Sequence, residues 1–341
     1  MLTLLLPLLA QAAAAQSAGR AQPDAKAPAE IVAAAPAGDW RAIAAEELLV
    51  MELAPGPNGR ERRVAIQLMP PPFAQGWVAN IRLLAKARWW DGTSVNRVQD
   101  NYVAQWGDAT EKKPLPAGLG KVAEAAYEQD WRNLVRDSRN LPTYDPAGGR
   151  SFDNGNCSMT SSEPSSSPCE QWDRPGDTYA DGTILYRGWP LASQTKPASE
   201  GRRTWPVHCY ATVGVGRNLS PDTGTGAELY TVIGHAPRHL DRNIAVVGRV
   251  VEGIEHLSSL PRGTEALGFY ETAAERTPIR SIRLASDLPA AERPRFQYLS
   301  TESASFAAYA DARANRRDAF FIRPAGGADI CNVPVPVRRT P

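Results

Sequence analysis

Short apolar runs separated by turn-forming residues dominate this chain, and helical patterns do not alternate with them. Strands are predicted for the runs that share this pattern, at 47–54, 62–70, 206–216, 226–236, 243–253 and 276–285. The first two runs flank "PGPNGRE", which predicts a hairpin. Parallel strands would require a crossover connection between each pair, so the pattern favours an antiparallel barrel over a parallel sheet.

A few stretches carry a helical pattern instead. The stretch 73–92 has tryptophan, isoleucine and leucine near helical spacing, and it ends in an Asp–Gly turn. A short helix is predicted within 253–260, and a surface helix within 300–321, entered through Ser300 or Thr301. We therefore predict a mainly β fold, a closed antiparallel barrel flanked by two or three helices.

The segment 109–205 departs from this pattern. It is dense in proline, glycine, serine and aspartate, which form turns and loops, and only 122–137 has a weak helical pattern. We predict a long loop-rich insertion, and a loop of this length inside a compact domain usually has a function. The domain that carries it then spans 39–285, and a C-terminal extension follows at 286–341.

The N-terminal residues "MLTLLLPLLAQAAAA" form an apolar run that ends in small residues. The run is shorter than the ~20 residues of a membrane span and fits a secretory signal peptide at 1–15, although no basic residue precedes it. An Ala/Pro-rich stretch without apolar periodicity follows at 16–38 and predicts a flexible linker. We therefore expect a periplasmic or secreted protein with no stable insertion in a membrane.

The four cysteines and the absence of a CxxC motif are consistent with an oxidising compartment. Three pairings are possible, and their spacing does not choose among them. Our hypothesis pairs Cys157 with Cys169, which closes a serine-rich loop, and Cys209 with Cys331, which ties the C-terminal segment to the body. The cysteine and histidine spacing matches no zinc pattern.

The charge balance argues against several classes of partner. The 38 basic and 37 acidic side chains give a formal net charge of +1, whereas proteins that bind nucleic acids or acidic membranes cluster Lys and Arg. The glycine-rich "GVGRNLSPDTGTG" lacks the lysine of a phosphate-binding loop, and no GxSxG nucleophile motif occurs. We expect no nucleic-acid partner and no metal.

One stretch combines side chains of unlike chemistry. "NRVQDNYVAQWGD" sets Arg97 and Gln105 among Tyr102, Val103 and other apolar residues, just before a Gly–Asp pair. This order of arginine, aromatic, hydrophobic residue and glutamine resembles the most diagnostic stretch of the cyclophilin-type peptidyl-prolyl cis–trans isomerases. "GTGAELYTVIGHAPRHLDRNIAVVGRVVEG" is similar to the G-S-Q-F-(F/Y)-I…L-D…V-F-G-x-V-x-x-G segment of that family. The resemblance covers roughly 45–107 and 206–285.

The resemblance also implies which residues form the site. Arg97 and Gln105 would be the catalytic residues. The residues that match the family's substrate-binding groove are Tyr102, Val103, Glu228, Tyr230, His239 and Leu240. Five positions depart from the family's pattern, since Asn96 and Ile244 replace histidines, Glu228 replaces a glutamine, Gly214 an asparagine, and His239 a tryptophan or phenylalanine.

Prolyl isomerisation needs no nucleophile. Rotation about an X–Pro bond has a barrier of ~18–20 kcal/mol, and a site lowers it by binding the twisted amide more tightly than either planar form. Arg97 would donate hydrogen bonds to that amide, Gln105 would orient Arg97, and the apolar residues would hold the proline ring. The expected partners are proline-containing polypeptides, bound by a monomer that needs no cofactor.

Other interpretations of the same residues stay open. Arg97 could form a surface ion pair with Asp100 or Asp108, and Tyr230 could be an ordinary core aromatic residue. The departures from the family's pattern also fit a cyclophilin-like binding or chaperone module with weak isomerase activity or none.

Overall fold

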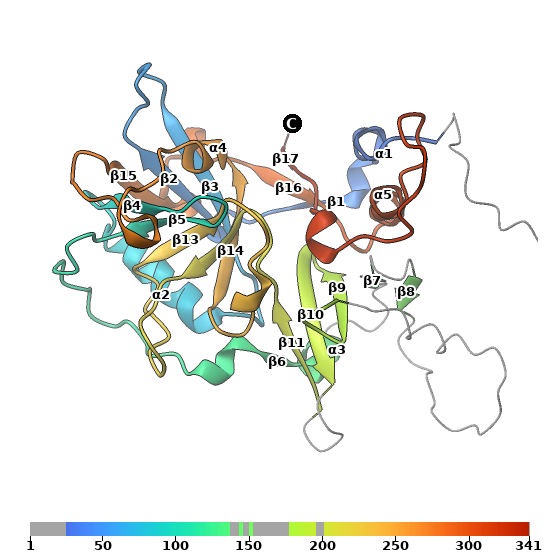
Figure 1. Cartoon of the computed structure of the whole chain (residues 1–341), viewed down its shortest axis with the longest axis horizontal. Coiled ribbons are helices and arrows are strands. Elements are labelled where there is room, and N and C mark those ends of the chain that lie inside the picture. Colours follow the sequence, from blue (N-terminus) through green and yellow to red (C-terminus); the bar gives the residue numbers. More distant parts are fainter. Residues whose placement is uncertain (1–24, 137–142, 146–149, 153–176, 196–200, 341) are drawn as a thin grey trace, which may run out of the picture.

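The structure is a computed structural model that describes residues 25–136, 143–145, 150–152, 177–195 and 201–340 (Figure 1). A closed barrel forms one body, and a second sheet with two helices lies beside it. The proposed signal peptide and the proposed Cys157–Cys169 bridge lie outside the described residues.

The barrel has eight strands in the order β12–β13–β5–β4–β15–β2–β3–β14, and neighbouring strands are antiparallel. The predicted mainly β fold with a closed antiparallel barrel is therefore confirmed. The strands are β2 (Leu48–Leu53), β3 (Arg62–Leu68), β4 (Ser94–Val98), β5 (Val103–Gly107), β12 (Thr212–Val215), β13 (Leu229–Val232), β14 (Val246–Glu252) and β15 (Thr277–Leu284).

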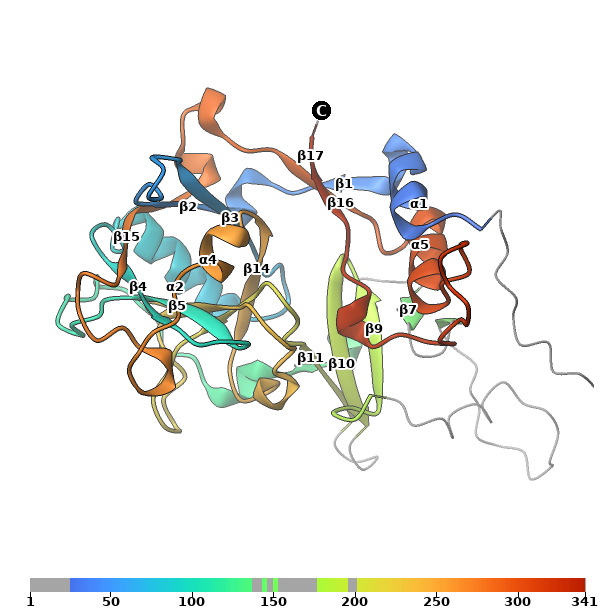
Figure 2. The ribbon, with the colours of Figure 1, turned by 45° about the horizontal axis from the view of Figure 1, so that its top comes forward.

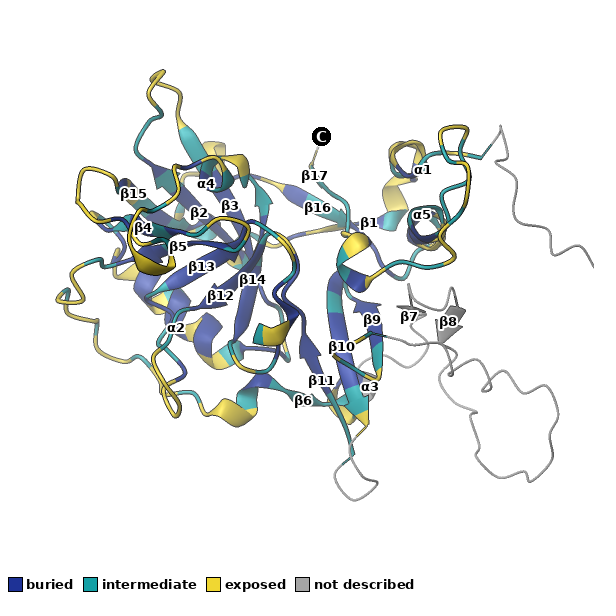
Figure 3. Ribbon diagram, in the orientation of Figure 1, coloured by how far each residue is buried: buried dark blue, intermediate teal, exposed yellow. Residues whose placement is uncertain are grey.

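Strand β2 is apolar along almost its whole length because both of its faces are covered. Leu49 and Met51 belong to the main core, whereas Leu48 and Val50 pack outside the barrel with Phe296 of the C-terminal extension. A strand buried on both faces reads as a continuous apolar run rather than an alternating one. Full burial of each such side chain stabilises the fold by about 1.5–3 kcal/mol. Figure 3 shows the resulting band of buried residues across the barrel.

Helix α2 (Gln75–Lys86) confirms the helix expected within 73–92. Its apolar spacing buries one face, with Trp77, Ile81 and Leu84 fully inside the core. The buried Asn80 on this helix donates to the carbonyl of Gly120 at 2.9 Å and accepts from its N–H at 2.8 Å. The helix thereby holds the start of the insertion against the barrel. The short helix expected within 253–260 is α4 (Glu255–Ser258).

The prediction that loops fill the insertion is wrong for its second half. It contains three paired strands, β9 (Gly182–Tyr186), β10 (Trp189–Thr195) and β11 (Arg202–Pro206). The six-stranded sheet to which they belong also contains β6 (Gln129–Asp130), β7 (Thr143–Asp145) and β8 (Arg150–Phe152). Proline in a run argues against a central strand, yet Pro190 and Pro206 both lie in paired strands here.

The helix suggested by 122–137 is also interrupted. Only Trp131–Arg136 is α-helical, as α3, and β6 comes directly before it. Gln129 and Asp130 pair with β11, so tertiary pairing overrides the weak local preference for helix.

The prediction of a flexible linker up to residue 38 is wrong for its last part, because Pro28–Ala34 form helix α1. This helix packs against α5 (Ala304–Ala314). Ala35 next to α1 and Phe306 on α5 share one buried cluster. A helix this short is not stable alone in water, so its stability depends on α5, which the local sequence does not reveal.

The two ends of the described chain meet in a small sheet of order β1–β16–β17. These strands are β1 (Trp40–Ala42), β16 (Phe296–Leu299) and β17 (Val337–Arg339), and they run between the barrel and α5 (Figures 1 and 2). Helix α5 begins later than predicted, since Ser303 is its N-cap and accepts from the N–H of Phe306 at 3.1 Å.

The predicted Cys209–Cys331 disulfide is confirmed, with Cα atoms 5.1 Å apart. It joins the segment between β11 and β12 to the C-terminal extension. Among the described residues, no helix has the length and apolar character needed to cross a membrane.

Candidate functional site

Strand register places the central site residues in one row on the outside of the barrel. Arg97 on β4 pairs with Gln105 on β5, which pairs with Tyr230 on β13, and Tyr230 pairs with Gly214 on β12. Residues directly opposite each other on antiparallel strands project from the same face of the sheet. The four residues therefore cross four adjacent strands side by side.

Arg97 is held in place by acceptors without charge. Its Nη1 donates to Gln105 Oε1 at 3.1 Å, its Nε donates to the carbonyl of Leu267 at 2.7 Å, and its Nη2 donates to Gln99 Oε1. Its guanidinium also faces the Tyr102 ring at 5.8 Å and the Phe269 ring at 5.3 Å. A guanidinium has five N–H groups, so these three bonds orient it and leave two N–H groups for a substrate.

The alternative in which Arg97 forms a surface ion pair is not what the structure has. Asp100 pairs with Arg262 at 2.9 Å. Asp108 accepts from the N–H groups of residues 112 and 113 at 2.8 and 2.6 Å. Across the described chain, Arg97 lies within ion-pair distance of no carboxylate. Burial lowers the pKa of Arg97 from its usual value, and the group stays charged at neutral pH because that value is so high.

An apolar cluster lies beside Arg97. Val103, Tyr230 and Val232 are buried in it, and its partly buried members are Tyr102, Leu240 and Ile244. The ring of His239 stacks on Tyr102, with centroids 6.3 Å apart and planes 13° from parallel. The substrate-binding residues expected from the sequence thus come together, apart from Glu228, and Ile244 extends the apolar surface.

Tyr230 is fixed by groups that the sequence analysis missed. Its hydroxyl lies 2.8 Å from His208 Nε2, and His208 Nδ1 lies 2.9 Å from Asp241 Oδ1. All three side chains are buried. Since a carboxylate only accepts, Nδ1 carries the proton in the contact with Asp241, and the Tyr230 hydroxyl lies within hydrogen-bond distance of Nε2. Burial raises the pKa of Tyr230 well above its usual value, so the hydroxyl keeps its proton.

Gly214 leaves the space that Tyr230 fills. A Cβ at residue 214 would lie 2.3 Å from the Tyr230 hydroxyl and from the adjacent ring carbon. Any larger side chain there would displace the ring. Glycine at 214, where the family's pattern has asparagine, is therefore required by the position of the Tyr230 ring.

A buried ion network connects this tyrosine to the insertion. Arg238 Nε donates to Asp241 Oδ2 at 2.6 Å, and its Nη1 donates to Asp177 Oδ2 at 2.5 Å. Asp177 belongs to the insertion, and the side chains of all three residues are 3–5% exposed. No sequence motif marks this network, because Arg238 and Asp241 are neighbours in sequence but Asp177 and His208 come from separate segments and join them only in the folded protein.

Glu228 lies beside the row of Arg97, Gln105 and Tyr230 rather than in the apolar cluster. Its carboxyl packs on Gly107, where a Cβ would lie 1.8 Å from Glu228 Oε1. Burial raises the pKa of Glu228 to about 6, against the opposing effect of the Gln105 and Asn96 side chains. Within the described residues, Glu228 Oε2 and Asn96 Oδ1 have no hydrogen-bond partner. A carboxylate here therefore faces Gln105, the residue that orients Arg97.

A family model and solved structures match this chain. The family model described as cyclophilin type peptidyl-prolyl cis-trans isomerase/CLD matches residues 71–284. The solved structure of cyclophilin AquaCyp293 from Hirschia baltica superposes with a TM-score of 0.60 at 21% sequence identity, covering 88% of this chain and 93% of that one. This fold similarity extends beyond 71–284 into the flanking segments. No curated protein matches the chain.

Proposed function

The chain belongs to the cyclophilin-type peptidyl-prolyl cis–trans isomerases, and we propose that it accelerates X–Pro isomerisation while exported polypeptides fold. The observation that carries the proposal is the row Arg97–Gln105–Tyr230 beside an apolar cluster. Family and fold support isomerase activity in general. The residue roles and the exported clients are our proposal.

Arg97 supplies the catalytic interaction. When the X–Pro bond twists, amide resonance is lost and the nitrogen lone pair becomes a hydrogen-bond acceptor. The N–H groups of Arg97 that are not bound to Gln105, Gln99 or Leu267 donate to this nitrogen and to the neighbouring carbonyl. These bonds are stronger in the twisted state than in either planar state, which is the condition for catalysis.

The neighbouring residues position the substrate. Tyr102, Val103, Tyr230 and Leu240 pack against the proline ring, and His239 extends that surface by its stacking on Tyr102. Gln105 accepts from Arg97 and so keeps the guanidinium directed at the amide. No cofactor takes part, and the protein acts as a monomer on proline-containing polypeptides.

The proposed compartment is the periplasm or the cell exterior. The apolar N-terminal run supports export, and the Cys209–Cys331 bridge is typical of proteins that fold in an oxidising environment. N-terminal sequencing of the exported protein tests this part, because a cleaved signal would leave a chain that begins near Gln16.

The enzymatic proposal is tested by a prolyl-peptide isomerisation assay with Arg97→Ala. We expect kcat/KM to fall by about 100-fold or more, the cost of removing one preorganised donor. Arg97→Lys should restore little of it, because an ammonium lacks the planar fork of donors. Arg280→Ala is the matched control, since Arg280 is exposed on β15 and its one ion pair among the described residues is with Glu61 at 3.3 Å.

A second candidate function is a binding module that holds proline-containing segments without isomerising them. The observation that favours it is Glu228, an acidic residue next to Gln105 where the family's pattern has a neutral glutamine. The same assay separates the two functions. Wild-type protein that binds the peptide but isomerises it no faster than Arg97→Ala or buffer would establish the binding module.

A further inference from the structure

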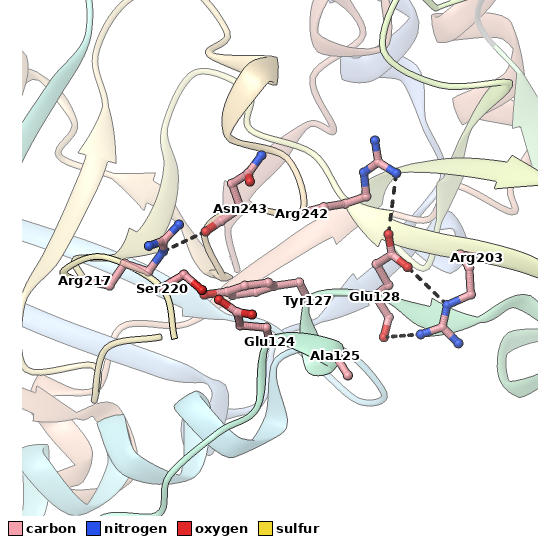
Figure 4. Close-up of a pocket in the computed structure, with 9 residues that line it drawn as sticks. All are labelled: Glu124, Ala125, Tyr127, Glu128, Arg203, Arg217, Ser220, Arg242 and Asn243. Carbon is pink, nitrogen blue, oxygen red and sulfur yellow. Dashed lines mark hydrogen bonds and ion pairs between the residues drawn. The ribbon is translucent and has the colours of Figure 1, made fainter. Parts of the chain in front are cut away.

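A polar depression of about 650 Å³ lies where the insertion meets the barrel (Figure 4). Its volume is in the range of ~300–1,000 Å³ that is typical of ligand sites. Its lining comes from the insertion, from β11 and from two barrel loops: Glu124, Ala125, Tyr127, Glu128, Arg203, Arg217, Ser220, Arg242 and Asn243.

The depression adjoins the proposed proline groove. Asn243 directly precedes Ile244, which belongs to the apolar cluster around Tyr230. Arg217 directly follows Gly216, where a Cβ would lie 3.7 Å from Gln105 Nε2. Consecutive Cα atoms are ~3.8 Å apart, so a peptide of a few residues bound at the groove spans both places.

The charges of the lining favour one anionic group. Three arginines face two glutamates there. Glu128 lies 3.2 Å from Arg203 and 3.6 Å from Arg242, so these three side chains form their own ion-pair group. The guanidinium of Arg242 is further fixed over the Trp205 ring at 4.4 Å.

Arg217 is positioned without an acidic partner. Its Nε donates to the carbonyl of Asn243 at 2.8 Å and its Nη1 donates to the carbonyl of Asn218 at 2.7 Å. Among the described residues, no carboxylate lies within ion-pair distance of Arg217. The side chain is therefore held in one orientation by two carbonyls and has a free Nη2 face, and the carboxylate of Asp222 is near enough to interact with its charge.

Tyr127 adds an unused donor to the same depression. Its ring stacks on Trp77 with centroids 5.3 Å apart, and only 9% of the residue is exposed. Its hydroxyl is buried and has no hydrogen-bond partner in the described part of the chain. In Figure 4 the ring lies across the depression with the hydroxyl directed toward Ser220 and Arg217. A buried polar group without a partner destabilises the protein, and an incoming acceptor would remove that cost.

We propose that this depression is a second subsite, which binds an acidic side chain of the same polypeptide close to its proline. The carboxylate accepts from Arg217 and from the Tyr127 hydroxyl, because a carboxylate only accepts hydrogen bonds. The glutamates in the lining favour a singly charged carboxylate over a doubly charged phosphate. The inference rests on the proposed function, since both sites hold one client chain.

The test uses full-length protein and a set of proline peptides. Each peptide carries a single aspartate at a different position before or after the proline, and its matched peptide has asparagine at that position. We expect wild-type protein to bind one aspartate peptide about tenfold more tightly than its asparagine match. Arg217→Gln should abolish the preference and leave binding of the asparagine peptides unchanged. Tyr127→Phe should weaken the preference and keep the stacking on Trp77, and Arg280→Gln serves as the control for a lost charge.

Binding is measured by fluorescence anisotropy and isomerisation in parallel, so the two proposals fail separately. An aspartate preference that persists in Arg217→Gln, or one found at no position, overturns the subsite. A phosphoserine peptide that binds more tightly than the aspartate peptide overturns the assignment to a carboxylate. If the wild type does not accelerate isomerisation but prefers aspartate peptides in a way that depends on Arg217, the enzymatic proposal is rejected and the subsite is supported.

Discussion

The two sides of the proposed proline groove are built in opposite ways. On one side, Arg97 is half-buried and bound only by neutral acceptors from β5, residue 99 and the loop at Leu267. On the other side, Tyr230 is fully buried and bound through His208 to the ion network of Asp241, Arg238 and residue 177. The Arg97 side leaves a positive charge that a substrate can contact, whereas the charged groups on the Tyr230 side pair with one another.

This difference corresponds to two proposed roles, catalysis for Arg97 and positioning of the proline for Tyr230. A cation that stabilises a twisted amide must not be neutralised by a neighbouring carboxylate, since an ion pair would compete with the substrate. A ring that forms the wall of a pocket needs a fixed place, which a buried hydrogen-bonded network provides. Mutations on the two sides should therefore change different measured quantities, activity for Arg97 and stability for the Tyr230 side.

The largest effect that we expect on stability is that of Asp241→Ala. This change leaves Arg238 buried with one acidic partner instead of two and leaves His208 Nδ1 without its acceptor. Breaking a buried ion group by removing one member costs about 3–5 kcal/mol of unfolding free energy. Urea denaturation followed by tryptophan fluorescence measures it.

The control for Asp241→Ala is Asp100→Ala, which breaks the exposed pair with Arg262. An exposed pair contributes less than about 1 kcal/mol. Equal losses in the two variants would contradict the contrast between the buried network and the surface.

A smaller effect is expected for Tyr230→Phe. The ring and its packing remain, but His208 Nε2 loses its buried partner, which should lower the unfolding free energy by about 1–3 kcal/mol. We expect kcat/KM to change less than tenfold, because the proposed function places the proline against the ring and not against the hydroxyl. Tyr102→Phe is the control, and a large loss of activity with unchanged stability in Tyr230→Phe would assign the hydroxyl a direct catalytic role.

The smallest effect is expected for Glu228→Gln, and it depends on pH. The pKa of Glu228 is raised from 4.5 to about 6 in the folded protein, so the folded state binds a proton more tightly than the unfolded state. Wild-type stability therefore falls as pH rises from about 4.5 to about 6 and stays lower above that, by about 1–2 kcal/mol at ~1.4 kcal/mol per pKa unit. The glutamine variant should lack this fall.

Denaturation of both proteins at pH 4.5 and pH 8 checks this prediction. We expect the wild type to lose stability between the two pH values and the glutamine variant not to show this loss. The isomerisation rate of the wild type should also change near pH 6, since Glu228 faces Gln105, and the variant should show no such step. A step of the same size in both proteins would assign the titration to another group.

Local patterns predicted those parts of the molecule whose contacts are encoded close together in sequence. The β2–β3 hairpin, α2 and the Arg97–Gln105 pair each depend on neighbouring residues, and the strand register then brings Tyr230 into line. The Cys209–Cys331 bridge was a hypothesis among three pairings, and the structure confirms it.

Contacts between distant segments explain what the sequence did not reveal. Helix α1 is too short to have a pattern of its own and is stabilised by α5. Strands β9 to β11 mix proline, threonine and arginine and depend on pairing with one another. Arg238 and Asp241 are three residues apart, but their contacts with His208 and Asp177 join segments that are distant in sequence, which no local spacing reveals.

The small sheet β1–β16–β17 also constrains the order in which a growing chain can fold. The ribosome makes Trp40 early, but its partner Leu299 emerges only after the whole barrel has been synthesised. Strand β1 therefore stays unpaired until β16 has been made, whereas β2 and β3 can pair across a short turn as soon as both have been made. Since β16 lies between β1 and β17, neither strand can pair until β16 has been made, after all eight strands of the barrel.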